Sequence, residues 1–303
     1  SLLSRNALCS SFCLQVIDFT AMLTHMTSDN DQKNEGFAHK KSLGQNFLTT
    51  PVVPNWMCDA GAVGAGDIVI EIGPGTGALT RALLARGATV YAIETDERAV
   101  AVLKETFAAE ITAGQLHLIY DDVRTFDFGT LPIVKNPYKI VANIPYYLSG
   151  FLLRHCLELP KPPTTIVFLM QKEVVERITR DTKSSLLSLS VRVYGEPKYF
   201  KTVSRGHFKP APNVDSAILA IHNITHEALP TTADREAFFI LLHAGLGQRR
   251  KQLLGTLTSL YPREALEHIF TDLELSLTVR GEDLSIKTWL TLYRTLQQSS
   301  VSK

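Results

Sequence analysis

Residues 68–77 have the sequence Ile68-Val69-Ile70-Glu71-Ile72-Gly73-Pro74-Gly75-Thr76-Gly77. The first five form a short β-branched run, which predicts a buried strand, and the glycines after it predict a tight loop. A helical pattern through Leu79, Leu83 and Leu84 comes next. A strand, a glycine-rich loop and a helix in this order begin a nucleotide-binding βαβ unit. The stretch therefore predicts an α/β fold with a parallel sheet.

The glycine loop also constrains the cofactor. Ala78 stands where a dinucleotide-binding loop has its last glycine, and because that fingerprint accepts alanine there, spacing alone leaves NAD open. Glu71, inside the strand, would repel a pyrophosphate at the helix N-terminus but would attract a sulfonium cation with a free amino group. The predicted cofactor residues of this segment are Glu71, Gly73, Gly75 and Gly77.

Two further acidic residues follow two further predicted strands. Glu94 ends the apolar run 90–93 and lies 21 residues after Gly73, where an acid can accept hydrogen bonds from both hydroxyls of a ribose. Asp122 follows the strand predicted at 116–120 and can accept one from an adenine amino group. Each acid alone is typical of a solvated loop. Three acids at successive strand ends, behind a glycine loop, favour S-adenosylmethionine.

The stretch Asn143-Ile144-Pro145-Tyr146 follows the apolar run 140–142, which predicts the end of a buried parallel strand. Open α/β sheets bind their ligands at that end. The Asn143 side-chain oxygen and the Ile144 carbonyl can each accept one hydrogen from an amine, and Tyr146 can stack on a planar ring beside the rigid Pro145. Taken alone, the motif fits an ordinary turn before a helix equally well.

Four more motifs occur in the chain in a specific order. They are Leu43-Gly44-Gln45-Asn46-Phe47-Leu48, Met170-Gln171-Lys172-Glu173-Val174-Val175, Phe208-Lys209-Pro210-Ala211-Pro212-Asn213-Val214-Asp215-Ser216 and Gln248-Arg249-Arg250-Lys251. Together with the glycine loop, the acids and the Asn143 motif, they make the chain resemble the KsgA-type ribosomal RNA adenine dimethyltransferases. The resemblance extends from Lys40 to about Thr295.

The resemblance implies a Rossmann-like class I methyltransferase sheet followed by a small all-helical C-terminal domain. It implies methyl transfer from S-adenosylmethionine to the 6-amino groups of adenines in small-subunit (16S) ribosomal RNA, giving dimethyladenosine during ribosome biogenesis. It adds Gln45, Asn46, Leu48, Val123 and Asn143 to the cofactor site. The expected catalytic residues are Asn143, Ile144, Pro145, Tyr146 and Phe208, with no metal.

The chain departs from the family pattern at two places. Residues 185–188 are Ser-Leu-Leu-Ser, where the family often has a Tyr-Gly pair, so any contact from that tyrosine is in doubt. Tyr147 follows the Asn143 motif, where many members have asparagine. The second change alters a position at the rim of the site but removes no group that methyl transfer needs.

Charge is unevenly distributed along the chain. The 303 residues have a formal net charge of only +1, which is unusual for an RNA-binding protein. Residues 161–209 nevertheless hold ten Lys or Arg against four Asp or Glu, and residues 59–131 hold five against eleven. Either segment could be a solvated face, but the basic one follows the catalytic strand and is the better candidate for phosphate contact. The predicted RNA-binding residues are Arg177, Arg180, Lys183, Arg205, Lys209, Arg249, Arg250 and Lys251.

Three segments are predicted. Residues 1–38 form a disordered or spurious extension: Arg5 alone fits a transit peptide and Asp18 counts against one, and Met26 is a plausible true start. Residues 39–223 form the methyltransferase domain, and residues 224–303 form a helical domain that contributes to RNA binding. Predicted elements are crossover helices at 97–107 and 148–157, a strand at 165–169, a closing antiparallel pair at 199–203 and 217–221, helical stripes around 238–242, 253–257, 266–270 and 289–293, and a loop at 280–285 that ends in a helix cap.

Cysteine use and hydropathy indicate a soluble cytoplasmic enzyme. Cys9, Cys13, Cys58 and Cys156 form no Cys-x-x-Cys pair and no zinc spacing, which fits a reducing compartment. We expect Cys58 and Cys156 to be core residues. No apolar run approaches the roughly 18 residues of a membrane span. We expect a monomer that acts on small-subunit ribosomal RNA in a pre-ribosomal particle.

Three other functions remain open from the sequence. The first is a large-subunit (23S) ribosomal RNA adenine methyltransferase that confers macrolide resistance; residues 171–173 and 248–251 favour the small-subunit substrate by resemblance only. The second is a ribosome-assembly or transcription factor that kept the fold and lost catalysis, which the complete set of predicted site residues disfavours. The third is a dinucleotide oxidoreductase, for which no hydride-handling acid–base pair is evident.

Overall fold

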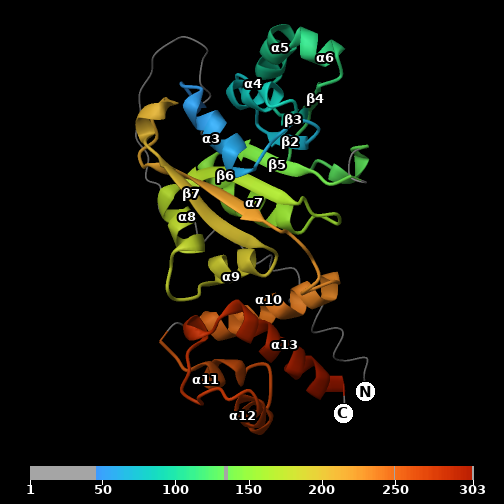
Figure 1. The fold of residues 1–303 in the computed structure, drawn as a ribbon. Helices are drawn as coiled ribbons and strands as arrows, with labels where there is room; N and C mark the ends of the chain where they lie inside the picture. Colours follow the sequence, from blue (N-terminus) through green and yellow to red (C-terminus); the bar gives the residue numbers. More distant parts are fainter. Residues whose placement is uncertain (1–45, 133–135, 249, 302–303) are drawn as a thin grey trace.

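The computed structural model describes residues 46–132, 136–248 and 250–301 (Figure 1). Its centre is a seven-stranded sheet with the order β4-β3-β2-β5-β6-β9-β7. The strands are β2 (Ile68–Ile72), β3 (Thr89–Glu94), β4 (Leu116–Tyr120), β5 (Lys139–Asn143), β6 (Thr165–Gln171), β7 (Glu196–Val203) and β9 (Ser216–His222). Strands β2 to β6 run parallel, and β9 is antiparallel to both β6 and β7. The predicted strands and the closing antiparallel pair are confirmed.

Successive side chains of the central strands point to opposite faces of the sheet, and a hydrophobic core covers each face. Val69, Val141 and Val167 pack on one face with α3 (Val52–Ala60), α4 (Ala78–Ala85) and α5 (Glu97–Thr106). Ile140 and Phe168, on the alternate positions, pack on the other face with α7 (Ser149–Leu157), α8 (Lys172–Thr179) and α9 (Leu186–Arg192). Because both faces are covered, these strands are apolar throughout rather than alternating.

Local sequence explains where the two predicted crossover helices begin and end. Helix α5 begins after Asp96, whose side chain accepts a hydrogen bond from the Arg98 N–H, and it ends one residue earlier than predicted. Helix α7 begins at Ser149, one residue after the predicted start, because the turn η3 (Tyr146–Leu148) follows Pro145. Helices α3, α6 (Ala108–Thr112), α8 and α9 were not predicted from the sequence.

The helical C-terminal part lies below the sheet in Figure 1 and consists of α10 (Thr232–Leu246), α11 (Leu253–Leu257), α12 (Arg263–Asp272) and α13 (Ile286–Val301). These helices confirm the four predicted stripes. Ser285 accepts a hydrogen bond from the Thr288 N–H at the start of α13, so the predicted cap is also confirmed. Trp289 is fully buried and donates to the Gly281 carbonyl at 3.2 Å.

One hydrophobic cluster continues from the sheet into these helices. It joins Tyr194, after α9, to Phe238 and Phe239 of α10. Sheet strands end at His222 and α10 begins at Thr232, on either side of the predicted boundary at residue 224. The extension 1–38 lies outside the described residues.

A second, two-stranded sheet positions the segment before the first helix. Strand β1 (Phe47–Leu48) pairs antiparallel with β8 (Phe208–Lys209). The next residue, Thr49, donates from its backbone and its side chain to the His207 carbonyl. The pairing therefore places residues 46–48 beside the segment between β7 and β9, some 160 residues later in the chain.

The burial of two cysteines and the hydropathy of the helices bear on two of the expectations. Cys58 and Cys156 are both 0% exposed, which confirms them as core residues. Across the ranges that the structure describes, no helix is long and apolar enough to cross a membrane.

Candidate active site

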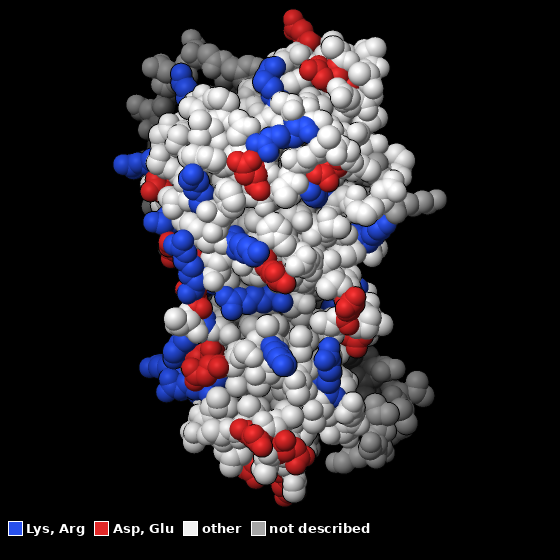
Figure 2. Space-filling view, viewed as in Figure 1, with Lys and Arg blue, Asp and Glu red and all other residues white. Residues whose placement is uncertain are grey.

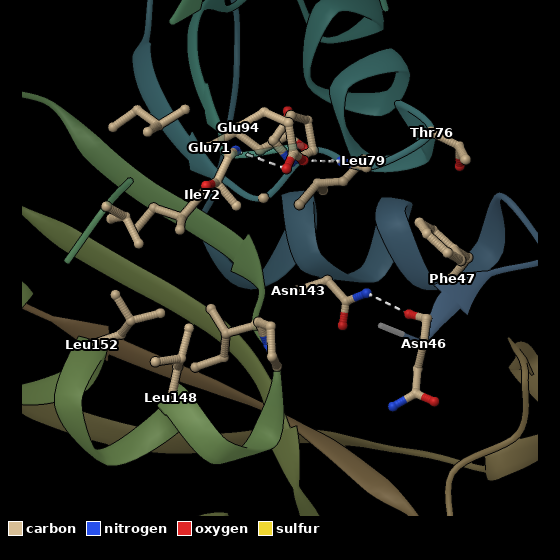
Figure 3. Close-up of a pocket in the computed structure, with 18 of the residues that line it drawn as sticks. Asn46, Phe47, Glu71, Ile72, Thr76, Leu79, Glu94, Asn143, Leu148 and Leu152 are labelled. Carbon is tan, nitrogen blue, oxygen red and sulfur yellow. Dashed lines mark hydrogen bonds between the residues drawn. The ribbon is translucent and has the colours of Figure 1, made fainter. Parts of the chain in front are cut away.

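A pocket opens at the carboxyl ends of β2, β3, β4 and β5 (Figure 3). It brings together most of the residues predicted from the glycine loop, the acids, the Asn143 motif and the motif at residues 43–48, which is called the lid segment below. The predicted residues that line it are Asn46, Leu48, Glu71, Gly73, Gly75, Glu94, Asp122, Val123, Asn143, Ile144, Pro145, Tyr146 and Phe208. Of the other two predicted residues, Gln45 lies outside the described ranges and Gly77 is not part of the lining.

The glycine loop needs its glycines for different reasons. Gly73, Gly75 and Gly77 all have positive φ, at 66°, 55° and 84°, a backbone conformation that other residues rarely adopt. Gly75 also lies against the Phe47 ring, because an added Cβ would stand 2.9 Å from its Cε1. Gly77 faces away from the pocket, and a Cβ there would lie 2.5 Å from the Phe107 ring of the α5 end. Gly77 therefore allows close packing of α4 against the end of α5, and the prediction that it contacts the cofactor stays a prediction.

Glu71 is the buried acid of the pocket. Glu71 is 1% exposed. Its Oε2 accepts a 2.7 Å hydrogen bond from the Thr80 hydroxyl, whereas its Oε1 has no hydrogen-bond partner. Burial raises the pKa of Glu71 to about 8, with the nearby Glu94 adding to the effect. An unpaired buried carboxyl oxygen is costly unless a cation meets it. The side chain therefore fits a ligand that carries positive charge, and fits a pyrophosphate poorly.

Glu94 is also buried, at 4% exposure, but its oxygens are already partly used. Oε2 accepts from the Gly75 N–H at 3.0 Å, and Oε1 accepts from the N–H groups of Thr95 and Asp96 at 2.8 and 2.9 Å. A carboxylate has about four acceptor positions, so about one stays open. Glu94 thus holds the glycine loop in place and keeps about one acceptor position for a ribose hydroxyl, and acceptance from both hydroxyls stays a prediction.

Asp122 lies at the pocket, yet Arg124 already binds its carboxylate. The Arg124 Nε donates to Oδ1 and Oδ2, both at 3.0 Å, and the Arg124 backbone N–H donates to Oδ1 at 2.9 Å. These hydrogen bonds hold the pKa of Asp122 below its ordinary value. An adenine amino group would share this carboxylate with Arg124. Arg124 is not among the predicted site residues, and the Asp-x-Arg spacing after a strand is the signal that would have indicated it.

Asn143 is oriented by the lid segment. Its Nδ2 donates to the Asn46 backbone carbonyl at 3.1 Å, as the dashed line in Figure 3 marks. The amide nitrogen is thereby used, and the oxygen is left as the free acceptor. Asn46 precedes β1, so the β1–β8 pairing determines the position of the carbonyl that fixes this side chain. The Asn46 carbonyl therefore positions the side chain that was predicted as an acceptor, and no sequence pattern indicated this contact.

The ring of Tyr146 is fixed through its hydroxyl. That hydroxyl lies 2.7 Å from Ser216 Oγ at the start of β9, and burial raises the pKa of Tyr146. Since the hydroxyl is occupied by Ser216, the ring face is the part of Tyr146 that remains available at the pocket. Ile144 is 2% exposed and Tyr147 is 46% exposed at the rim.

Phe208 has two surroundings. It is 5% exposed within the hydrophobic cluster of α3 and α4, and it also lines the pocket. Its backbone pairs with Leu48, so Phe208 is the residue through which β8 holds the lid strand. This burial supports core packing, and the predicted role of Phe208 beside the target base stays a prediction.

The predicted RNA-binding residues lie outside the pocket. Arg180, Arg205, Lys209, Arg250 and Lys251 are exposed, and Arg177 is half-buried. Lys183 is exposed but pairs with Glu282 and with Asp283 at 3.8 Å, which ties the α8–α9 connection to the C-terminal part. Arg249 is outside the described residues.

The chain matches a known protein family over most of its length. Residues 36–298 match the family described as "Ribosomal RNA adenine dimethylase". The "Ribosomal RNA small subunit methyltransferase A" of Lactococcus lactis is 36% identical over 273 residues, covering 86% of this chain and 90% of the relative. The protein of the same name from Enterococcus faecalis is 33% identical over 294 residues, covering 93% and 98%.

Solved structures show the same fold. The 23S rRNA methyltransferase ErmE is 26% identical with a TM-score of 0.67 and covers 84% of this chain and 100% of its own. A dimethyladenosine transferase from Plasmodium falciparum is 23% identical with a TM-score of 0.72 and covers 84% and 98%. The second likeness shows the shared fold alone.

Proposed function

Because the chain belongs to the ribosomal RNA adenine dimethylase family, we propose that its pocket transfers methyl groups from S-adenosylmethionine to the 6-amino groups of adenines in small-subunit ribosomal RNA. The observation that carries the proposal is the orientation of Asn143, whose nitrogen is held by the Asn46 carbonyl so that its oxygen is free to accept. That arrangement suits an amine substrate, which presents hydrogens.

The pocket residues fit S-adenosylmethionine. This cofactor supplies a methyl group on a positively charged sulfur, beside an amino group. The unpaired Glu71 Oε1 suits those positive charges, and the remaining acceptor position of Glu94 suits a ribose hydroxyl. At the far end, Asp122, Val123 and Arg124 would enclose an adenine ring.

The chain activates the amine without a strong base. An adenine amino lone pair is delocalised into the ring and is a poor nucleophile. The Asn143 oxygen and the Ile144 carbonyl each accept one amine hydrogen, which favours a more tetrahedral nitrogen and directs its lone pair toward the methyl group. The same two oxygens stabilise the positive charge that develops on the nitrogen, and its proton leaves after transfer.

The target base reaches this site only outside its stack. Tyr146, with its hydroxyl fixed by Ser216, offers a preoriented ring face to hold it. A monomethylated amine keeps one hydrogen, so a second round with fresh cofactor gives dimethyladenosine.

The finer features of the proposal concern the setting of the reaction. We propose that the substrate is small-subunit ribosomal RNA within a pre-ribosomal particle, and that the enzyme acts as a monomer in the cytoplasm. The exposed basic residues on and after α8 support phosphate contact, which positions an RNA without reading its sequence.

Single-turnover transfer of labelled methyl groups to small-subunit particles tests the proposal. At saturating S-adenosylmethionine, Asn143→Ala should lose transfer by about 10²–10³-fold, the scale for deleting one preorganised hydrogen-bond partner. Asn55→Ala, at an exposed asparagine of α3, is the matched control and should behave like the parent.

Two results would refute parts of this account. If the Asn143→Ala variant turned over like the parent, the proposed mechanism would be wrong. If the parental enzyme methylated 23S but not 16S ribosomal RNA, the proposed substrate would be wrong and large-subunit RNA would take its place. For Tyr146, the Phe variant should retain much of the rate and the Ala variant should not, because the ring face carries the stacking.

A further inference from the structure

An exposed aromatic residue on the outer strand of the sheet has no role in the site described above. Phe200 lies in β7, the edge strand, and is 44% exposed. The pairing of β7 with β9 shifts register between Tyr199 and Lys201, so Phe200 is the extra residue of a β-bulge. A bulge turns a side chain away from the regular face of a sheet and is typically found at edges and near functional sites.

Two cations contact aromatic rings beside the bulge, one on each face of the sheet at its edge, because Tyr199 packs on the α8 face and Trp56 on the α3 face. The Arg180 guanidinium lies 3.6 Å from the centre of the Tyr199 ring, and the Lys201 ammonium lies 4.0 Å from the centre of the Trp56 ring. Lys198 is exposed on the same strand. No described residue makes a ring contact with Phe200 itself. Figure 2 shows Lys and Arg gathered along the left margin, where Figure 1 places β7 and α8.

Protection of the sheet edge explains only part of this arrangement. Natural edge strands commonly carry lysines and bulges, which prevent pairing with another chain. Lys198, Lys201 and the register shift fit that purpose. An exposed phenylalanine at the bulge works against it, because it adds an apolar contact to the edge that the lysines protect. Phe200 therefore needs a different explanation.

The surroundings match the chemistry of single-stranded nucleic acid. Proteins that bind unpaired strands combine cations that follow the phosphates with aromatic rings on which bases stack. The cations here are held over rings in the free protein, so less side-chain freedom is lost when phosphates bind. We propose that Phe200 is a stacking platform for an unpaired base of the RNA substrate, with Arg180 and Lys201 at the neighbouring phosphates. This inference rests on the proposed function and adds a second contact to it.

The platform lies at a fixed distance from the catalytic residue. Strands β6 and β9 separate β7 from β5, whose last residue is Asn143. Three strand spacings amount to roughly 14 Å. Ser216, whose hydroxyl lies against that of Tyr146, pairs with Val203 of β7. Val203 comes three residues after Phe200, so Phe200 lies near the end of the sheet at which the pocket opens. The stacked base is therefore a near neighbour of the methylated adenine along an unpaired strand, which makes an unpaired segment beside the target part of substrate recognition.

Salt-dependent binding separates stacking from charge. The full chain, with S-adenosylhomocysteine added, would be titrated with oligo(A) RNA and with small-subunit particles at several salt concentrations. Phe200→Ala should weaken binding by about 5- to 150-fold, the range for one stacked base, with the salt slope unchanged. Phe200→Tyr should bind like the parent and Phe200→Leu should not. Lys201→Gln should instead reduce the salt slope by about one. Leu277→Ala, another exposed apolar residue, is the control and should have no effect.

The outcomes distinguish this inference from the proposed function. Parental affinity of Phe200→Ala for both RNAs, or equal binding by Phe200→Leu and the parent, would overturn the platform. If Phe200→Ala lost binding to the particles but kept binding to oligo(A), the platform would also be overturned. Phe200 would then contact a ribosomal protein instead of an unpaired base. Methyl transfer by the parental enzyme is measured separately. Its absence from small-subunit particles would refute the proposed function whatever Phe200 does.

Discussion

Replacing Glu71 with glutamine should change the pH dependence of stability. Glutamine keeps the shape of the side chain and an oxygen to accept the Thr80 hydroxyl, but it cannot ionise. In the parental protein the carboxyl is buried and its pKa is raised from 4.5 to about 8. The folded protein thus binds this proton more tightly than the unfolded chain does. The stabilisation from Glu71 is fully present below about pH 4.5 and is lost as pH rises toward 8.

The size of the effect follows from the two pKa values. Each unit of difference corresponds to about 1.4 kcal/mol between the protonation states. Between pH 5 and pH 8, the parental protein should lose roughly 3 to 4 kcal/mol of unfolding free energy through this single group. Glu71→Gln should lose none of it, so the free energy of unfolding of the variant should rise relative to the parent by that amount.

Urea unfolding at half-unit steps from pH 5 to pH 8.5 measures the difference. The matched control is Glu105→Gln, at an exposed glutamate of α5, whose unfolding free energy should follow the parent. Parallel curves for Glu71→Gln and the parent would refute the reasoning, since Glu71 would then ionise in the folded state as easily as in the unfolded one.

Cofactor binding provides an independent readout of the same group. A cation next to Oε1 favours the ionised form, so S-adenosylmethionine should release protons from the parental protein near pH 7 and none from Glu71→Gln. Calorimetry in buffers of different ionisation enthalpy detects the release. S-adenosylhomocysteine keeps the amino group and lacks the sulfonium, and its proton release therefore identifies which cation Glu71 meets.

Two further predictions concern the cofactor loop. Glu94→Ala should weaken S-adenosylmethionine binding by about 1.5–3 kcal/mol, the scale of charge-assisted hydrogen bonds, and calorimetry giving unchanged affinity would place the ribose elsewhere. Gly77→Ala should lower the free energy of unfolding by at least 1 kcal/mol in urea, because its φ is 84° and its Cβ would meet Phe107 at 2.5 Å. A Gly77→Ala variant with parental stability would refute the packing role of Gly77, because α5 would then accommodate the added methyl group.

The sequence predicted the sheet and most of the pocket because those features come from local patterns. β-branched runs before glycine or asparagine gave β2 and β5 with their bounds nearly correct, and their parallel pairing placed Glu71 and Asn143 at one edge. Helical stripes predicted the C-terminal helices. Helix α3 was missed even though Val53 and Met57 face the core, as no capping side chain marks its start after Pro51.

The features that the sequence could not predict depend on side-chain contacts across the chain. Gly77 matches the loop pattern as well as Gly75 does, and only the structure shows that a Cβ at Gly77 would meet the Phe107 ring. The competition of Arg124 for Asp122 arises from side-chain geometry that residue types do not reveal. The Phe200 bulge requires the register of β7 against β9, which a run of mixed polar and aromatic residues leaves open.

The Asn46–Asn143 hydrogen bond has a consequence for how the site forms. Asn46 and Asn143 are 97 residues apart, and the carbonyl of the first reaches the amide of the second through the β1–β8 pairing. The same short strand brings Phe47 against Gly75, so residues 46–48 touch both the cofactor loop and the catalytic amide. If this segment left the pocket, the Asn143 amide could rotate and present hydrogens instead of an oxygen to the amine. The segment that covers the cofactor side of the pocket is therefore also the one that gives Asn143 its accepting orientation, which couples enclosure of the pocket to assembly of the methyl-accepting site.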